Sequence, residues 1–273
     1  RDVKTIGKHA FADCTSLVSI TIPNSVTTIE EEAFSGCTGL ASIDIPNSVT
    51  TIEESAFAES GLTSVIIPKS VTLIDAYAFA GCNSLTSIIV DSGNDVYDSR
   101  DNCNAIIVSA ADSLIAGCIN TIIPTSVKTI GCAAFAAFTS LVSIVIPNSV
   151  TAIDEEAFCF SGLTCMILPN SVTSVGHEAF EGCESLTDVV IGSGMTSIAS
   201  HAFEDCSSLN NVYCYATEPP VAAYNYRSDY FSYAFDLSHI EEHTTLHVPE
   251  ESLETYRTTA PWSNFKNIVS LTE

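Results

Sequence analysis

Histidines are the first residues of this sequence whose type and spacing could do chemistry. His239 and His243 lie four residues apart, so they would share one face of a helix, and His247 follows four residues later. A zinc-protease helix needs a glutamate directly after the first histidine, and Ile240 stands there instead. A weak surface metal site is one interpretation. Ordinary polar surface is the favoured one, so we predict no metal and no cofactor.

An acidic stretch is the second candidate for metal chemistry. It supplies six side chains that could offer oxygen ligands: Asp91, Asn94, Asp95, Asp98, Asp101 and Asn102. Calcium binds several such oxygens. The spacing, however, matches neither the EF-hand loop nor the glycine-rich nonapeptide. A solvated acidic turn is the favoured interpretation, and calcium binding is the alternative.

The cysteines show a regular spacing and no catalytic motif. The chain has 11 of them, an odd number, and contains no Cys-x-x-Cys pair. Five recur three residues after a phenylalanine: Cys14, Cys37, Cys82, Cys183 and Cys206. None of these five stands in a motif with a histidine that could act as its base. The pattern favours buried, reduced thiols packed in a column, although neighbouring thiols could approach disulfide geometry.

Carboxylates also recur, for example at Glu30–Glu32, Glu53–Glu54 and Asp154–Glu156. Acid–base catalysis needs two carboxylates in different environments, whereas equivalent turns of a repeat should provide similar ones. No nucleophile elbow, Walker A motif or dinucleotide-binding glycine motif occurs. We therefore predict that the protein is not an enzyme.

The composition excludes further classes of function. With 9 Lys and Arg against 33 Asp and Glu, the formal net charge is −24, so the overall field repels nucleic acid and anionic membranes. No apolar run approaches the ~20 residues of a membrane-spanning helix, so we predict no direct membrane insertion. Apolar residues make up 46% and charged residues 15%, which excludes a disordered chain. Because it begins at Arg1 without an initiator methionine or signal peptide, we expect a mature or trimmed fragment.

The elements that position these residues follow from an internal repeat. Ala-Phe dipeptides end at Phe11, Phe34, Phe57, Phe79, Phe135, Phe158, Phe180 and Phe203. Their spacing is 22 or 23 residues, apart from one gap of 56. A Pro-x-Ser-Val motif keeps the same step. Units this short cannot bury an apolar face alone, so they predict stacked coils that share one core.

One unit, LVSITIPNSVTTIEEEAFSGC, illustrates the expected coil. Ile20, Thr21 and Ile22 alternate as in a half-buried strand, and Pro23 ends it. Val26 and Ile29 predict a second short extended segment. A helical turn should begin at Glu30–Glu32, and Ala33 with Phe34 should enter the core.

The repeated motif Leu-x-x-Ile-x-Ile-Pro-x-Ser-Val-x-x-Ile-x-x-x-Ala-Phe-x-x-Cys resembles the BspA-like leucine-rich repeat family. The resemblance covers roughly residues 3–215. It implies a β-rich, right-handed solenoid of 22- or 23-residue coils, with a parallel sheet on one side and short helical turns on the other. It also implies a bacterial-type protein, secreted or at the cell surface, with binding or adhesion as its general role.

Two segments depart from the repeat. Within residues 91–120, strands at 104–108 and 113–116 around Ala110–Asp112 predict a hairpin in an irregular unit. After residue 215 the pattern fails, and we expect a C-terminal cap over residues 216–273 that follows a solenoid over residues 1–215. Strands at 245–248 and 268–269 and a short helix at 250–258 are expected within it.

The predicted binding site is the outer face of the sheet. If Ile20 and Ile22 point inward, the position of Thr21 points outward. In the later coils this position holds Asp44, Ile66, Ile89, Ile122, Val145, Ile167, Val190 and Tyr213. A contiguous exposed apolar row favours an interaction site. The alternative is that β-branched residues simply suit strands.

The sequence thus predicts an extracellular or cell-surface scaffold that binds an unknown protein, such as a host or community surface protein, through this face. The alternative is a carbohydrate-binding module that uses the tyrosine-rich C-terminal region. Its candidate residues are Tyr224, Tyr226 and Tyr230.

Overall fold

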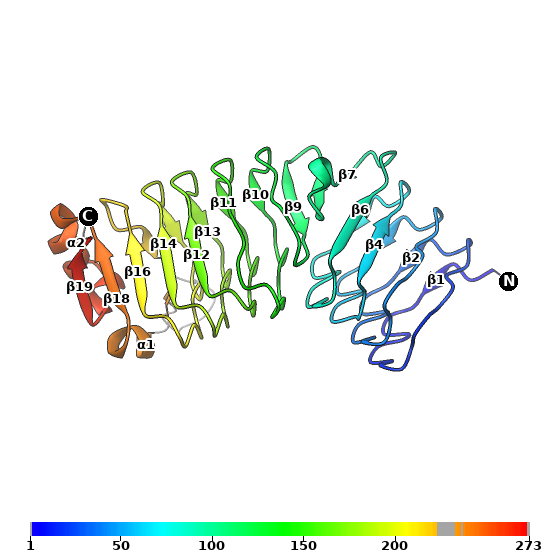
Figure 1. The fold of residues 1–273 in the computed structure, drawn as a ribbon, viewed down its shortest axis with the longest axis horizontal. Helices are drawn as coiled ribbons and strands as arrows, with labels where there is room; N and C mark the ends of the chain where they lie inside the picture. Colours follow the sequence, from blue (N-terminus) through cyan, green and yellow to red (C-terminus); the bar gives the residue numbers. More distant parts are fainter. Residues whose placement is uncertain (1, 223–232, 236, 272–273) are drawn as a thin grey trace. The chain divides into compact units, whose positions relative to one another are not determined.

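The computed structural model describes residues 2–222, 233–235 and 237–271. The chain folds into two compact units: unit 1 comprises residues 1–127 and 131–140, and unit 2 comprises residues 128–130 and 141–273. Each unit is a stack of coils whose strands pair with the coils above and below, as the repeat predicts (Figure 1).

Unit 1 places short parallel strands at the same point of successive coils. They are β1 (Thr5–Ile6), β2 (Thr28–Ile29), β3 (Thr51–Ile52) and β5 (Leu73–Ile74), in that order across one sheet. Longer strands, β4 (Ser64–Ile67) and β6 (Ser87–Val90), pair in parallel in a second sheet. The first two coils have no strand at this second position, so the strand expected at Ile20–Ile22 is wrong, whereas the one at Ile29 is confirmed.

Unit 2 repeats this plan, and the strands that belong to it pair with one another in parallel at two positions of the coil (Figure 1). The short strands are β10 (Thr129–Ile130), β11 (Ala152–Ile153), β13 (Ser174–Val175), β15 (Ser197–Ile198) and β17 (Val221–Ala222). The longer strands are β12 (Cys165–Leu168), β14 (Asp188–Ile191), β16 (Asn211–Cys214), β18 (Thr245–Val248) and β19 (Asn267–Ser270).

A turn segment closes each coil where a short helical turn was expected. In the second coil, Glu32 and Gly36 adopt left-handed φ angles of 53° and 67°. The N–H groups of Glu32, Phe34 and Gly36 donate to carbonyls of the next coil over 2.8–3.0 Å. The intervening N–H groups, of Ala33 and Ser35, instead close bonds within the turn. In an α-helix every N–H after the first four bonds to the carbonyl four residues earlier, so a continuous helix would not offer alternate N–H groups to the next coil as this turn does.

Phenylalanine rings form a continuous stack along the core of each unit. In unit 1 the stack runs Phe11, Phe34, Phe57 and Phe79, with ring centroids 5.2–5.5 Å apart and planes within 5°. In unit 2 it runs Phe158, Phe180, Phe203 and Phe235 at 5.0–5.3 Å. Phe235 is a further repeat position that the search by period missed, because the segment before it is longer than a normal coil.

The C-terminal segment ends this aromatic stack. Trp262 and Phe265 meet the Phe235 ring edge-on at 5.6 and 5.2 Å. The indole N–H of Trp262 donates to the carbonyl of Pro220 over 2.9 Å, which satisfies its polar atom inside the core.

The predicted strands are confirmed as β18 and β19, and the predicted helix as η2 (Glu250–Ser252) followed by α2 (Leu253–Thr258). The division between array and cap at residue 215 stays a prediction.

The irregular unit contains the predicted hairpin. Strands β8 (Ile106–Val108) and β9 (Ser113–Ala116) pair antiparallel. Strand β7 (Tyr97–Asp98) pairs with the other edge of β8 and is also antiparallel to it. A 3-10 turn, η1 (Arg100–Asn102), separates β7 from β8. The hydroxyl of Tyr97 accepts the N–H of Ile74 over 3.0 Å, which ties this unit to the coil before it.

The recurring cysteines have a common structural role. All 11 cysteines lie within the described residues, and they are present as thiols that are not joined in disulfides. The buried thiols of Cys37, Cys82 and Cys183 each donate to a phenylalanine carbonyl of the preceding coil over 3.0–3.3 Å. Where serine replaces cysteine, as at Ser60, the hydroxyl lies 3.3 Å from the next thiol, that of Cys82. The column is therefore held by polar contacts as well as by packing.

The ring stack predicts a large loss of stability when one ring is removed. Phe180 is fully buried between Phe158 and Phe203, so Phe180→Ala should lower the free energy of unfolding by about 3–5 kcal/mol. The matched control is Phe160→Ala, because Phe160 is 53% exposed; it should change the free energy by less than about 1 kcal/mol. Urea denaturation of both variants measures this, and equal losses would contradict a stabilising stack.

Candidate functional site

The longer sheet of unit 2 separates inward from outward side chains. Along β12, Met166 and Leu168 are buried, whereas Cys165 and Ile167 are exposed. The residues predicted for the outer face of this unit lie on its surface: Val145 and Ile167 are 84% and 60% exposed, and Val190 and Tyr213 are partly exposed.

The strand register aligns these residues into one row, which we call the apolar row. Ile167 pairs with Val190, Val190 with Tyr213, Tyr213 with His247, and His247 with Val269. The rings of Tyr213 and His247 stack with centroids 4.4 Å apart. His247 and Val269 were missed by the sequence reasoning, which followed the repeat only to residue 215. Polar and apolar residues alternate over Thr245–Val248, and this pattern could have predicted a strand that extends the apolar row to His247.

A polar row runs beside the apolar row on the same face, through Cys165, Asp188, Asn211, Thr245 and Asn267. Its middle members are connected by hydrogen bonds. The amide nitrogen of Asn211 donates to Asp188 over 2.9 Å, and the hydroxyl of Thr187 donates to the other oxygen of this carboxylate over 2.6 Å.

The histidine of the apolar row joins this network. The amide oxygen of Asn211 lies 3.2 Å from Nε2 of His247 and can only accept, so Nε2 carries the proton. Burial lowers the pKa of His247 below its ordinary 6.5, which keeps the imidazole neutral at pH 7. The face therefore combines ordered apolar area with fixed polar groups.

Unit 1 carries a shorter version of the same face. Ile66 and Ile89 are paired in register on β4 and β6 and are both exposed. Asp44 is exposed and lines a depression of about 250 Å³ together with Ile66. Ile122 is 75% exposed, and its N–H donates to the carbonyl of Cys103.

The remaining sequence candidates fall elsewhere. Tyr224, Tyr226 and Tyr230 lie outside the described residues. His239 is on α1 (Leu237–Glu242), where its Nε2 lies 2.8 Å from the carbonyl of Leu209. Nε2 of His239 is therefore engaged by a backbone carbonyl, although a metal site at His239 and His243 would need a free nitrogen on each ring.

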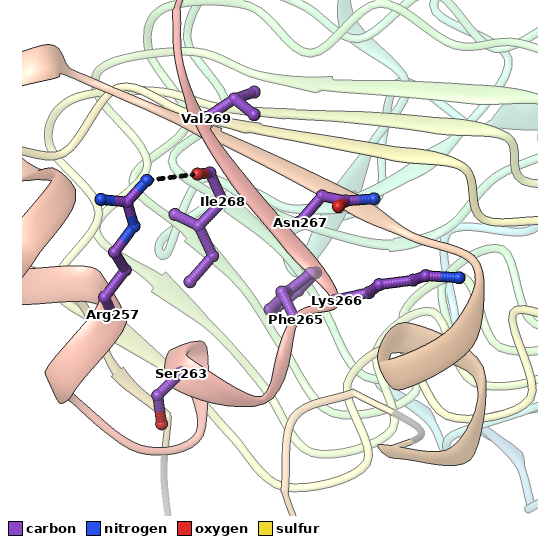
Figure 2. Close-up of a pocket in the computed structure, with 7 residues that line it drawn as sticks. All are labelled: Arg257, Ser263, Phe265, Lys266, Asn267, Ile268 and Val269. Carbon is purple, nitrogen blue, oxygen red and sulfur yellow. Dashed lines mark hydrogen bonds between the residues drawn. The ribbon is translucent and has the colours of Figure 1, made fainter.

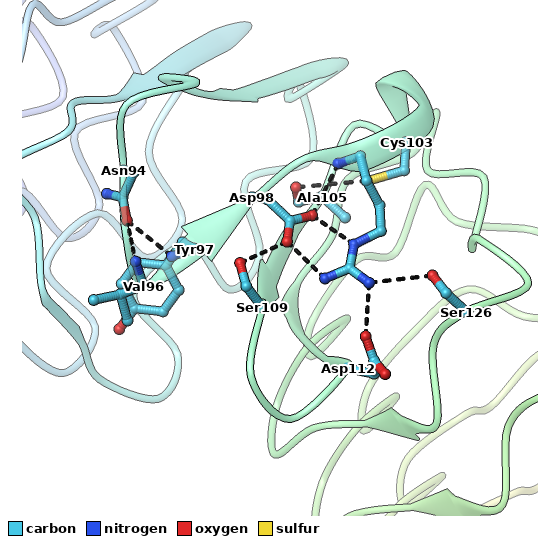
Figure 3. A network of polar contacts seen from close by, with 10 residues as sticks. Asn94, Val96, Tyr97, Asp98, Cys103, Ala105, Ser109, Asp112 and Ser126 are labelled. Carbon is cyan, nitrogen blue, oxygen red and sulfur yellow. Dashed lines mark hydrogen bonds and ion pairs between the residues drawn. The ribbon is translucent and has the colours of Figure 1, made fainter.

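The acidic stretch forms an internal network around Arg100 (Figure 3). The guanidinium donates to both oxygens of Asp98 over 2.6–2.7 Å and to Asp112 over 2.6 Å. The hydroxyl of Ser109 also donates to Asp98. These hydrogen bonds, with that from Arg100 the largest, lower the pKa of Asp98 to about 2.

Other oxygens of this stretch are also used within the protein. The side-chain oxygen of Asn94 accepts the N–H groups of Val96 and Tyr97 (Figure 3). The carboxylate of Asp91 accepts the N–H of Gly93. The expected solvated turn is therefore wrong at Asp98 and Asn94, which stabilise the irregular unit. The calcium alternative is also weakened, because these oxygens already accept from protein donors.

The carboxylates on the turn side of the coils do not share one environment. Near the N-terminus, His9, Glu31 and Glu32 bring their ligand atoms within 4.8 Å of one another, but Lys8 forms an ion pair with Glu31 at 2.5 Å. In unit 2, burial raises the pKa of Glu181 to about 7, and the negative charges of Glu178 and Glu204 contribute. The similar environments expected from the repeat are therefore not found.

Comparison with known families gives one match. Residues 3–105 and 116–231 match the model of the BspA type leucine rich repeat region, in 6 copies. The gap between the two matched segments covers most of the hairpin of the irregular unit. No curated protein sequence matches the chain.

Solved structures of bacterial repeat proteins resemble the fold. A leucine rich cell surface protein from Faecalibacterium prausnitzii is 28% identical, with a TM-score of 0.55 over 77% of this chain and 69% of that one. A leucine-rich repeat protein from Eubacterium ventriosum is 21% identical, with a TM-score of 0.60 over 99% and 81% of the two chains. The pneumococcal vaccine antigen PcpA is 20% identical, with a TM-score of 0.59 over 99% and 85%.

Within the part of the chain that the structure describes, no helix is long and apolar enough to cross a bilayer.

The raised pKa of Glu181 predicts that replacing this acid with a neutral residue stabilises the protein at high pH but not at low pH. Its folded pKa is about 7 against an ordinary 4.5, so the folded state favours the protonated acid and loses stability as the pH rises from 4.5 through 7. Glu181→Gln mimics the protonated form. It should raise the Tm at pH 8 and leave it nearly unchanged at pH 4. The control is Glu184→Gln at an exposed position, which should show no such dependence. Parallel Tm curves for wild type and Glu181→Gln would contradict the assignment.

Proposed function

The chain belongs to the BspA-type leucine-rich repeat family, and on this premise we propose that it is an extracellular or cell-surface scaffold that adheres to other proteins through its outer sheet face. The observation that carries the proposal is the apolar row of unit 2, in which Ile167, Val190, Tyr213, His247 and Val269 align on five paired strands.

The face has the features of a protein-binding surface. Its apolar side chains are contiguous, and contiguous exposed apolar area marks interaction sites more often than scattered residues do. Tyr213 is held against His247 before any partner arrives, so little conformational entropy is lost when it is buried. The polar row beside it, centred on Asp188 and Asn211, supplies fixed acceptors and donors that would select the partner.

A role without catalysis agrees with the chemistry of the thiols. Burial raises the pKa of Cys82, Cys103 and Cys183 to about 11, so these thiols are not ionised at neutral pH and are poor nucleophiles. They serve instead as donors to backbone carbonyls, as described for Cys82 and Cys183.

The surface location is supported by the relative from F. prausnitzii, which is a cell surface protein. Adhesion to a protein of a host or of neighbouring bacteria is the form of binding that we propose for such a location. The carbohydrate alternative through Tyr224, Tyr226 and Tyr230 stays a prediction, because these residues lie outside those described.

Substitution within the outer face tests the proposal. The double variant Val145→Asp/Ile167→Asp places two carboxylates where a partner would cover them, at two exposed positions of unit 2. Binding of the labelled protein to intact host or bacterial cells, followed by flow cytometry, should require at least about tenfold more protein. Ile89→Asp tests the corresponding face of unit 1 in the same way.

The matched control is Val221→Asp, at a 68% exposed valine on the other sheet of unit 2. It should bind cells like the wild type, and all variants should keep the wild-type Tm. Treating the cells with protease should remove binding, whereas glycosidase should not. Undiminished binding by Val145→Asp/Ile167→Asp would refute the site, and sensitivity to glycosidase alone would favour the carbohydrate alternative.

A further inference from the structure

One carboxylate on the outer face of unit 2 is held in place before any partner arrives. Asp188 lies on β14, and its side chain is partly exposed. The amide nitrogen of Asn211 donates to one of its oxygens over 2.9 Å, and the hydroxyl of Thr187 donates to the other over 2.6 Å. Because each oxygen has its own donor, the carboxylate is fixed in one orientation.

A histidine fixes the direction of the Asn211 amide in turn. The carboxylate of Asp188 can only accept, so the amide nitrogen of Asn211 faces it. The amide oxygen of Asn211 then faces Nε2 of His247, 3.2 Å away. The imidazole of His247 is itself stacked against Tyr213. Three neighbouring strands, β14, β16 and β18, therefore position this one charge.

The charge of Asp188 is not neutralised by any residue that the structure describes. Both of its donors are neutral, and none of the ion pairs within the described ranges includes it. A carboxylate has about four lone-pair sites, so about two remain for a partner. The charge also acts on the next strand: burial first, and then the charge of Asp188, raises the pKa of the Cys165 thiol, its partner in register.

The strands of this sheet supply no positive charge of their own. Strands β12, β14, β16, β18 and β19 contain no Lys or Arg, and Asp188 is their only acid. Covering an unpaired charge with a protein partner is costly unless that partner provides the opposite charge. The face therefore discriminates between partners at Asp188.

The cations at β19 are engaged elsewhere. Arg257 and Lys266 line a groove of about 340 Å³ beside this strand (Figure 2). Arg257 donates to Glu254 and to the carbonyl of Ile268. Lys266 donates to the carbonyl of Glu242. Strand β19 is also three strands away from β14, or about 14 Å, whereas charges are largely screened beyond about 8 Å at physiological salt.

The surroundings of Asp188 indicate which cation fits. Val190 lies two residues further along the same strand and on the same face, in register with Ile167 and Tyr213 of the apolar row. The polar and apolar rows are thus about 7 Å apart. Lysine and arginine combine a long apolar stem with a charged end, so one such side chain can lie on the apolar row and reach the carboxylate.

We propose that the outer face of unit 2 selects a protein partner that presents a basic side chain, Arg or Lys, beside apolar ones. This inference rests on the proposed function and names the chemistry of the partner. The cation donates to the remaining lone pairs of Asp188, and the apolar neighbours cover Val190 and Tyr213. Charge-assisted hydrogen bonds are about twice as strong as neutral ones. The net charge of −24 also attracts basic partners to the chain.

The experiment selects random peptides displayed on phage against the immobilised full chain at physiological salt. Arg and Lys should be enriched at least about twofold over the unselected library, together with apolar residues. On Asp188→Asn the enrichment of basic residues should disappear, whereas that of apolar residues should remain. This variant keeps an oxygen for the amide of Asn211 and a polar group for the hydroxyl of Thr187, so it should keep the wild-type Tm.

Affinity gives a second readout. The consensus peptide of the wild-type selection is synthesised, and its binding to the full chain is measured by fluorescence polarisation. Asp188→Asn should bind it about tenfold more weakly than the wild type. Asp188→Lys reverses the charge, so selection on this variant should enrich acidic residues in place of basic ones.

The matched control is Asp205→Asn, at an exposed aspartate of a turn segment. It removes the same charge from the chain, at a left-handed position that asparagine tolerates, so basic residues should stay enriched. Equal enrichment of basic residues on wild type and Asp188→Asn would overturn the inference. An equal loss on Asp205→Asn would also overturn it, because net charge and not Asp188 would then select the peptides.

Failure of this inference can be distinguished from failure of the proposed function. If Val145→Asp/Ile167→Asp loses binding to cells while Asp188→Asn still selects basic peptides, the face binds its partner without Asp188 and this inference alone is wrong. If Val145→Asp/Ile167→Asp binds cells like the wild type, the proposed function is wrong at this face, and the inference falls with it.

Discussion

Hydrogen bonds between the backbones of successive coils are the interaction on which the rest of each unit depends. They run along the stack at the short strands, at the longer strands and at the turn segments. Because each bond joins equivalent positions, equivalent side chains must lie above one another. Phenylalanine stacks on phenylalanine, thiols meet the phenylalanine carbonyls, and threonine hydroxyls such as those of Thr50 and Thr173 donate to the carbonyl of the preceding coil.

This constraint explains why so much of the fold could be predicted from the sequence. A single period of 22 or 23 residues places Phe34 over Phe57 and sets Ile167 beside Val190 on the outer face. The left-handed residues of the turn segments could not be predicted, because positions such as Glu32 and Phe160 are not glycine. The tail of the apolar row was missed at His247 and Val269, where the motif has decayed but the register continues.

Structural features that occur in one coil only could not be predicted from the 22- or 23-residue repeat. The network of Asp98, Arg100 and Asp112 joins residues of the irregular unit that no motif pairs. The raised pKa of Glu181 depends first on burial, which composition does not report, and then on Glu178 of its own turn and Glu204 of the next coil. Residues that differ from the repeat pattern are expected to determine which partner the proposed binding face selects. A uniform row of β-branched residues offers apolar contact area but discriminates little between partners. Tyr213, His247 and Asp188 are departures of this kind on the outer face.

The direction of the bonds between coils also has a mechanical consequence. They point along the stack, so a load applied along that direction acts on the few bonds of one junction at a time. Coils would then separate in sequence, each releasing 22 or 23 residues of chain, or about 75 Å when extended. A protein tethered between two bodies could lengthen stepwise in this way and limit the peak force on its attachment.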